Sequence, residues 1–404
     1  MAEKRKLAGK TSPKVESNED NSQNESKSEK LKPSNSTYEK EKNSPNADKE
    51  SSSSLKTAAV NLIKGLVLVV VVPVLLNYAA LVREGKELRP DGELVDIGNG
   101  QKLFKQCYGN GKPTVFLDAP LGMTSEVWAL VAPALSRTAR VCMYDRAGLG
   151  FSDRPMMTRG NASSKNMGQL HSVERMVEDF QKLLAGETKP YILVGADLGA
   201  SVVKFYTQLF PNDVAALLFI NPLFEGLFVG PENPWTRYWS KALLPSLQLK
   251  HICSALGLTR LGIQLGLLKE EFVYPRMPDV SRNRQKHLMC KPAHISSRVE
   301  ESYFMNESLS QMRILQKIRP LSEEIPVTIV WTSEYNKDFT REENNFWQST
   351  HSLYSKLVSS KELHVESMKG RVPDIFFSKN MAIVKHIETV VRKSRDRLKR
   401  EAKY

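Results

Sequence analysis

Cysteine is scarce in this chain of 404 residues, which contains only four. A small scaffold held together by disulfides is therefore excluded, and so is a collagen-like or fibrous repeat. The turn containing Gly148 and Gly150 is not followed by the G-x-G-x-x-G pattern that cradles a dinucleotide. Acidic residues are outnumbered, with 45 Asp and Glu against 58 Lys and Arg and a net charge of +13. No recognised nucleic-acid module accompanies this excess, so we expect no nucleic-acid partner.

Aromatic residues are almost missing from residues 1–56, where Tyr38 stands alone. This segment has 12 basic and 10 acidic side chains and many Ser and Asn residues. It cannot bury enough apolar surface to offset the entropy lost on ordering, so we predict a disordered polar tail. Because 12 minus 10 leaves only +2, most of the positive charge lies in residues 57–404.

Charge is missing altogether between Lys64 and Arg83, where the sequence reads GLVLVVVVPVLLNYAALV. Such a run nearly reaches the ~20 residues that cross a hydrocarbon core, so residues 57–83 are predicted to be a single-pass membrane anchor with the lipid bilayer as its partner. A cleaved signal peptide would begin much earlier in the chain. Lys and Arg residues flank the run on both sides, and we favour a cytosolic tail.

Residues 84–404 alternate between short apolar runs and amphipathic stretches. The runs KLFKQCY, TVFLDA, RVCMYD, YILVGA, ALLFIN, VTIVW and ELHVES are typical of strands. Residues 125–136, 172–186, 199–210, 341–357 and 378–398 have helical spacing. The alternation predicts an α/β domain with a mostly parallel sheet flanked by helices. Residues 223–320 interrupt it with Leu- and Pro-containing helical pieces, and we interpret them as an inserted helical lid.

The turn after YILVGA carries the chemistry that the sequence offers. Gly195-Ala196-Asp197-Leu198-Gly199 has small residues on both sides of a central polar one, as in a sharp strand-to-helix turn that presents one side chain above a sheet. Together with DIGNGQKLFKQCYGNGKPTVFLDAPLG, VCMYDRAGLGFSD and ALLFINPLFEG, in that order along the chain, it resembles the α/β-hydrolase superfamily, in particular its proline-iminopeptidase-like or esterase-like branch.

The resemblance implies a Ser, Asp/Glu and His triad, and two of its positions are substituted. Asp197 stands at the nucleophile position, and Arg371 follows Gly370 where the family has Gly-His. Glu334, with Asp338 as a second choice, stands at the acid position. The oxyanion donors would be the backbone N–H groups of Leu198 and of residue 120 or 121, and only Leu121 has one, because Pro120 lacks it.

These substitutions leave three hypotheses open. Arg371 stays protonated and cannot act as the base that turns over an ester, so we first expect an impaired enzyme, a pseudoenzyme with a binding or scaffolding role for an apolar or lipid-like ligand. In this reading Asp197, Arg371 and Glu334 form a salt-bridge triad. The second is an active hydrolase with Asp197 as nucleophile, similar to haloalkane dehalogenases or epoxide hydrolases and needing a base from elsewhere, such as a lid His. The third is an esterase or lipase with Ser201 or Ser333 as nucleophile.

We expect no cofactor and no metal. His287, Cys290 and His294 form a loose H-x2-C-x3-H pattern, but no second Cys/His cluster completes a tetrahedral zinc site. Cys253 and Cys290 would be either a disulfide or two buried thiols, and Cys142 is expected in the core. The basic end of the chain, from Arg392 to Lys403, is expected to be either a solvated helix end or a contact with anionic headgroups.

Overall fold

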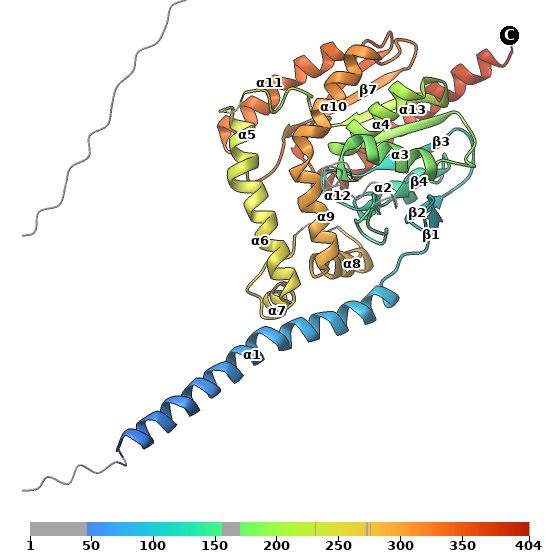
Figure 1. Ribbon diagram of the computed structural model, residues 1–404. Helices are drawn as coiled ribbons and strands as arrows, with labels where there is room; N and C mark the ends of the chain where they lie inside the picture. The colour runs from blue at the N-terminus through green and yellow to red at the C-terminus, as the bar shows by residue number, and fades with distance from the viewer. Residues whose placement is uncertain (1–46, 156–169, 231, 272–273, 275, 404) are drawn as a thin grey trace, which may run out of the picture. The chain divides into compact units, whose positions relative to one another are not determined.

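The computed structural model describes residues 47–155, 170–230, 232–271, 274 and 276–403 (Figure 1). Residues 1–46 of the predicted tail lie outside this set. Residues 47–56 are the first residues of a helix. Residues 61–404 form one compact unit.

Helix α1 spans Ala47–Glu87 and contains the whole predicted anchor. It begins ten residues before residue 57, since the polar, serine-rich stretch before the apolar run is also helical. Its segment Ser54–Glu87 reaches a mean hydropathy of 2.5 over an 18-residue window in which no residue is buried. By length and composition this helix is compatible with a membrane anchor.

The sheet has eight strands in the order β1-β2-β4-β3-β5-β6-β7-β8. Strands β1 and β2 pair antiparallel at one edge, β2 also runs antiparallel to β4, and the remaining pairs are parallel. Seven of the eight were predicted, and the exception is the short edge strand β1. The strands are β1 (Glu93–Asp96), β2 (Lys102–Tyr108), β3 (Thr114–Asp118), β4 (Val141–Tyr144), β5 (Tyr191–Ala196), β6 (Val214–Ile220), β7 (Val327–Glu334) and β8 (Leu363–Arg371).

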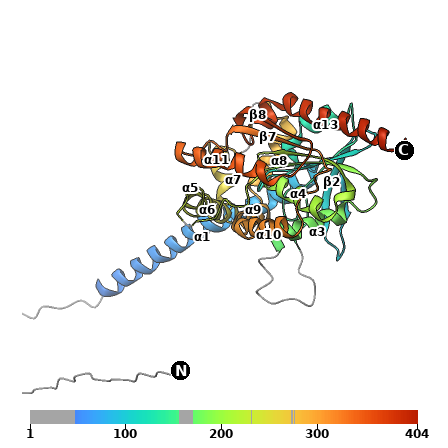
Figure 2. The same cartoon turned by 90° about the horizontal axis from the view of Figure 1, so that it is seen from above.

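Helices cover both faces of this sheet, as the apolar periodicity predicts. Figure 2 shows α13 on one side and α3, α4 and α10 on the other. Each face has its own apolar core, and the central strands β3, β5 and β6 are fully buried because they contribute to both. The helices outside the lid are η1 (Ser125–Trp128), α2 (Val131–Leu135), α3 (Val173–Leu183), α4 (Leu198–Leu209), η3 (Pro211–Asp213), α11 (Arg341–Leu357), α12 (Ile375–Ser378) and α13 (Asn380–Glu401).

The segment between β6 and β7 is helical, as the predicted lid at 223–320 requires. Its elements are α5 (Pro234–Tyr238), the π-helical turn η4 (Trp239–Leu243), α6 (Leu244–Ala255), α7 (Leu258–Gln264), α8 (Asp279–Met289), α9 (Pro292–Tyr303) and α10 (Met305–Ile318). Trp235 and Trp239 stack at its root and pack against Phe339, which follows β7. The lid is therefore joined to the sheet by a shared aromatic core.

The structure contains a disulfide that the sequence did not predict. Cys107 on β2 and Cys142 on β4 lie directly opposite each other and form a disulfide. Cys142 is buried as expected, but it is bonded. Cys253 and Cys290 are free thiols, of which only Cys290 is fully buried. Along the sequence 35 residues separate the bonded pair, and only the register of β2 against β4 brings them together.

Part of the basic C-terminal helix is structural. Arg395 donates a hydrogen bond to the backbone carbonyl of Lys112, and Arg397 donates to the carbonyls of Ala215 and Glu324. These contacts satisfy carbonyls at the ends of strands and loops. These basic residues hold α13 against the domain. Neither interpretation of the sequence included this role.

Candidate functional site

Asp197 occupies the sharp turn between β5 and α4. Its φ of 52° and ψ of −115° are unfavourable for a side chain with a Cβ, and a conformation of this kind costs about 1–3 kcal/mol. A Cβ on Gly199 would lie 2.7 Å from the carbonyl oxygen of Ala119, and one on Gly195 would overlap the backbone of Gly199. The turn thus requires glycine on both sides, and it presents Asp197 above the carboxyl ends of the central strands.

The Asp197 carboxylate is buried and has only neutral hydrogen-bond donors. The backbone N–H of Leu121 donates to Oδ2 at 3.3 Å, and the Tyr335 hydroxyl lies 3.3 Å from both carboxylate oxygens. Burial raises the pKa of Asp197 to about 7, although the hydrogen bonds from Leu121 and Tyr335 oppose the shift. Burial likewise raises the pKa of Tyr335, so its hydroxyl remains a donor. At neutral pH both protonation states of Asp197 are populated.

The predicted salt-bridge triad does not form as proposed. The Nε of Arg371 donates to Asp374 at 2.6 Å, and one terminal nitrogen lies 3.6 Å from a carboxylate oxygen of Glu334. The Arg371–Glu334 half is therefore present, with side chains 38% and 52% exposed. Among the ion pairs of the described residues, none joins Arg371 to Asp197.

The reason lies in the pairing of the last two strands. The register of β7 against β8 shifts between Thr332 and Glu334, so that Glu334 faces Arg371 across the ladder near the surface. The next residue on the β7 side, Tyr335, is buried and reaches Asp197 instead. On the β8 side, Val372 and Pro373 line the cavity above Asp197. The side of the cavity next to the family's His position is therefore lined by apolar residues, and Arg371 itself does not line it.

All seven histidines lie among the described residues, and none lines the cavity beside Asp197. Those of the lid have other partners: His287 pairs with Glu84 of α1, and His294 accepts a hydrogen bond from the backbone of Gly150. His351 stacks on Trp331, and burial lowers its pKa to about 4. A lid His, the example of a base given for the second hypothesis, is thus not positioned for that role.

The remaining candidate residues are the two alternative Ser nucleophiles and the H-x2-C-x3-H pattern, and each of them has another environment. Ser201 is buried in α4, and the Ser333 hydroxyl is bonded to the backbone of Gly370. His287 and His294 hold the contacts described above and converge on no common point with Cys290. In the described part of the chain, the one group of at least three potential ligands is Cys107, Cys142 and Glu187, and its sulfurs are in the disulfide.

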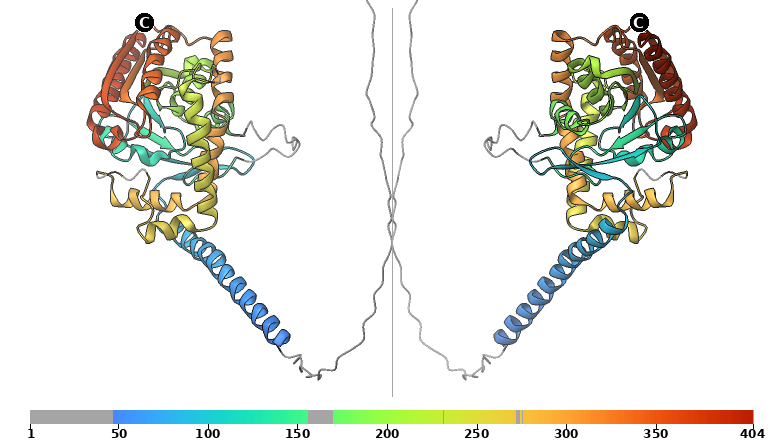
Figure 3. Two further views of the ribbon diagram at one scale, coloured as in Figure 1. Left: turned by 90° about the vertical axis from the view of Figure 1, so that its left-hand side faces the viewer. Right: turned by 90° about the vertical axis from the view of Figure 1, so that its right-hand side faces the viewer.

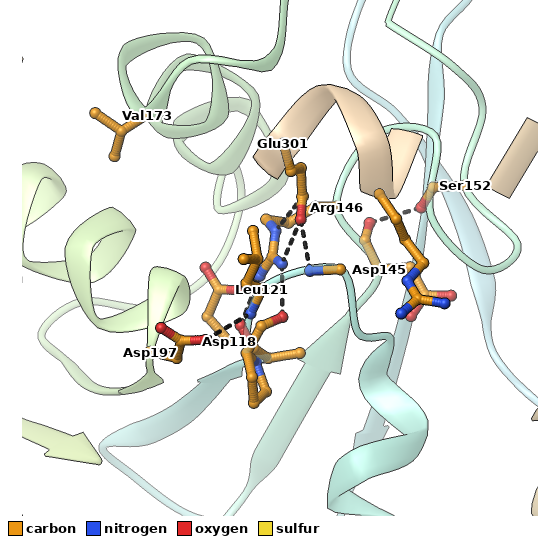
Figure 4. A network of polar contacts seen from close by, with 12 residues as sticks. Asp118, Leu121, Asp145, Arg146, Ser152, Val173, Asp197 and Glu301 are labelled. Atoms are coloured by element: carbon orange, nitrogen blue, oxygen red, sulfur yellow. Dashed lines mark hydrogen bonds and ion pairs between the residues drawn. The ribbon is translucent and has the colours of Figure 1, made fainter. Parts of the chain in front are cut away.

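A second buried polar centre, which the sequence did not reveal, lies beside the loop after β3 (Figure 4). All five N–H donors of Arg146 are used there. Two go to Glu301 of α9, at 2.8 and 3.1 Å, and one to Asp118 at 2.6 Å. The other two bind the carbonyls of Ala119 and Pro120 at 2.7 and 2.8 Å.

The carboxylates keep Arg146 charged in this position. Burial alone would lower its pKa, but Glu301 and Asp118 outweigh that effect and raise it. Glu301 also accepts the backbone N–H of Gly122 at 2.8 Å. The loop 119–122 is thus fixed from both sides, and the N–H of Leu121 remains directed at Asp197. Leu121, and not Pro120, provides the donor on this loop, while Leu198 opens α4 directly after Asp197.

A cavity of about 140 Å³ lies above Asp197 and Tyr335. Apolar side chains from the lid and the core form most of its wall, and Arg298, Ser302 and Asn336 contribute polar groups. The apolar lining residues are Pro120, Leu121, Met123, Tyr238, Leu243, Leu247, Val372 and Pro373. Such a mixture of apolar walls with a few convergent polar groups is typical of a small-molecule site.

The comparisons with known proteins agree with this fold. Residues 110–249 match the family described as alpha/beta hydrolase fold. A probable transporter of Hormonema carpetanum is 33% identical over 140 residues, and an AB hydrolase superfamily protein of Gibberella zeae is 27% identical over 134 residues. These matches cover 33% and 31% of this chain, and the chain spans only 18% and 39% of the two curated relatives.

Solved structures extend the likeness to most of the domain. A mutant of a proposed epoxide hydrolase from Pseudomonas aeruginosa superposes with a TM-score of 0.56 at 14% identity, covering 76% of this chain and 98% of that one. A proposed lipase from Acinetobacter baumannii superposes with a TM-score of 0.53 at 17% identity, covering 80% and 97%. With its strand order, its strained turn after β5 and the match of residues 110–249, the domain has the α/β-hydrolase fold.

Proposed function

We propose that this chain is a membrane-anchored protein of hydrolase fold that binds a small apolar ligand above Asp197 without turning it over by the family's triad chemistry. The observation that carries the proposal is the environment of Asp197. Its carboxyl group faces an apolar cavity, and its donors are Leu121 and Tyr335. Arg371, at the position of the family's His, is bonded to Asp374, and the next residues, Val372 and Pro373, line the cavity.

The chemistry follows from the missing base. A carboxylate nucleophile forms an ester with its substrate, and that ester must be hydrolysed by water that a base activates. Loss of such a base typically costs about 10²–10⁴-fold in rate. In the protonated form, which its pKa makes common at neutral pH, Asp197 is instead a hydrogen-bond donor for a ligand carbonyl. Arg298 and Asn336 add polar contacts at the wall.

Membrane anchoring by α1 is part of this proposal. It rests on the length and hydropathy of Ser54–Glu87. The disulfide between Cys107 and Cys142 supports a domain outside the cytosol, because such bonds persist in oxidising compartments. This orientation agrees with a cytosolic tail and disfavours contact of α13 with the anionic cytosolic leaflet.

The test uses the full chain in lipid nanodiscs. Binding is followed by titration calorimetry with ethylbenzene, and turnover with p-nitrophenyl acetate and styrene oxide. We expect saturable binding and no multiple turnover. Leu243→Trp fills the cavity and should abolish binding, whereas Leu353→Trp, on an exposed face of α11, should leave it unchanged. Sustained hydrolysis that Asp197→Asn removes would overturn the proposal.

A second candidate, an Asp-nucleophile hydrolase, is favoured by one observation: a hydroxyl donor, Tyr335, stands within reach of Asp197. Attack of the carboxylate oxygen on an epoxide carbon would open the ring, and the alkoxide would take a proton from Tyr335. Without a base the resulting ester would accumulate. Mass spectrometry of the intact protein after incubation with styrene oxide distinguishes the two, because a stable adduct on Asp197 supports the second candidate.

A further inference from the structure

The lid is hydrogen-bonded to helix α1 at the ends of its helices α6 and α8. The side-chain amide of Asn77 donates to the backbone carbonyls of Ser254 and Cys290, at 3.2 and 3.0 Å. Gly257 has a φ of 71° and packs so closely on the carbonyl of Pro73 that a side chain there would overlap it. Figure 3 shows the resulting arrangement in two views, with α7 beside α1. The lid therefore touches α1 within its uncharged run.

We call residues 252–268, which comprise the end of α6, helix α7 and the turn after it, the lid tip. It has one charged residue, Arg260. The guanidinium of Arg260 donates to both carboxylate oxygens of Glu84, at 2.6 and 2.8 Å, and its Nε donates to Asn77 at 2.9 Å. The single charge is thus paired and hydrogen-bonded, as charges at membrane depth usually are.

The outer surface of the lid tip is apolar. Large aliphatic side chains point away from the protein along it, with Leu265 62% and Leu267 76% exposed. A continuous apolar surface of this kind marks an interaction site. It lies beside the exposed aliphatic side chains of α1. The exposed residues of the lid tip include Ile252, Leu256, Leu261, Leu265, Leu267 and Leu268.

The depth of the contact identifies the partner. The uncharged run of 18 residues between Lys64 and Arg83 has a helical length of roughly 27 Å, close to the thickness of a hydrocarbon core. If Arg83 marks its edge, Pro73 lies about 15 Å deeper, and the lid tip lies beside it. Keeping the lid tip in water would require the span to end at Pro73, and Lys56 and Lys64 would then enter the hydrocarbon.

We infer that the lid tip is embedded in the bilayer next to α1, so that the protein contacts lipid through both elements. This inference rests on the proposed anchoring by α1. It also defines where a ligand comes from. Leu247 lines the cavity near Asp197 and lies on the same helix, α6, that enters the lid tip. The ligand of the cavity is accordingly an apolar molecule that partitions into the bilayer.

The experiment places an environment-sensitive fluorophore at single cysteines of the full chain. Cys253 is first replaced by Ser so that only the introduced thiol reacts, since Cys290 is buried. Lid-tip variants Leu265→Cys and Leu267→Cys are compared with Met381→Cys and Ile318→Cys. The controls are apolar residues with matched exposures of 62% and 76% on α13 and α10. Leu68→Cys reports on α1 itself.

Each labelled protein is reconstituted into phosphatidylcholine vesicles with or without brominated acyl chains. We expect the lid-tip probes and the α1 probe to emit at shorter wavelength and to lose most of their fluorescence with brominated lipid, while the two controls change little. Quenching at Leu68 with lid-tip probes that behave like the controls would overturn the inference and leave the anchor intact. No quenching at Leu68 would overturn the anchoring as well.

Discussion

Arg146 and Asp197 are both buried at the carboxyl end of the sheet, and the loop containing Leu121 separates them (Figure 4). Arg146 has a partner for every donor, and its partners are two carboxylates and two carbonyls. Asp197 has an N–H and one hydroxyl shared between two oxygens. A fully satisfied centre fixes structure, whereas an under-satisfied one facing a cavity is available to a ligand. The following variants test this difference.

The largest loss of stability is expected from Arg146→Met. This change leaves the carboxylates of Asp118 and Glu301 buried without their counter-charge, which typically costs about 3–5 kcal/mol. The midpoint of thermal denaturation should fall accordingly. Arg154→Met provides the matched control, because its pair with Glu300 is half exposed and should contribute no more than about 1 kcal/mol. Equal midpoints for the two variants would contradict a structural role for Arg146.

The second variant, Asp197→Asn, should stabilise the protein at high pH. The pKa of Asp197 is raised from 3.8 to about 7, so the folded state holds its proton where the unfolded state has lost it. The free energy of unfolding therefore falls as pH rises from about 4 to 7 and is flat above that range. With 1.36 kcal/mol per pKa unit, Asn should gain up to about 4 kcal/mol at pH 8 and little at pH 4. The midpoints of thermal denaturation of the two proteins at pH 8 and at pH 4 measure this gain in stability.

A smaller effect is expected from Tyr335→Phe. Removing the hydroxyl takes a hydrogen bond from the ionised carboxylate and should cost about 1 kcal/mol at pH 8. It should also move the pKa of Asp197 further upward, since that hydrogen bond lowers it. The pH at which the thermal midpoint becomes constant reports this pKa. Tyr303→Phe, at an exposed tyrosine of the lid, should shift neither quantity.

The smallest effect is expected from Arg371→His. Its side chain is bonded to Asp374 and lies near Glu334 at the surface, where an ion pair contributes about 0–1 kcal/mol. Because it does not face Asp197, the new His should restore no hydrolysis of styrene oxide. Val372→His places a ring on the wall of the cavity and is the informative companion. Turnover by Arg371→His would mean that Arg371 silences the site after all.

The fold was predictable because its signals are local. The run YILVGA coincides with β5, and the small residues around Asp197 coincide with the strained turn. The helical lid follows from the lost alternation after β6. What could not be predicted depends on relations between distant segments. The shift of register between β7 and β8 sends Arg371 outward and Tyr335 inward, and a resemblance based on the Gly-His step cannot detect such a shift.

The buried Arg146 centre and the disulfide also depend on contacts between segments that are distant in the sequence. Glu301 reaches Arg146 from a lid helix 155 positions away, and nothing in its neighbourhood marks it. The carboxylate of the neighbouring Asp145 makes local hydrogen bonds, accepting the backbone N–H groups of Ser125 and Phe151. Arg146, however, serves the loop and the lid. A cross-strand disulfide depends on register in the same way.

Glu301 should also affect how a ligand enters and leaves the cavity. It accepts three hydrogen bonds, two from Arg146 and one from Gly122, all in a buried site. Swinging α9 away from the core would break all three at once and strand a charge, so a hinged opening of the whole lid is rarely populated. Ligand exchange then depends on the side of the lid that lacks this tie, where Leu243 and Leu247 border the cavity. Residence times should follow the side-chain motions of those two leucines rather than the rate of a domain-scale movement.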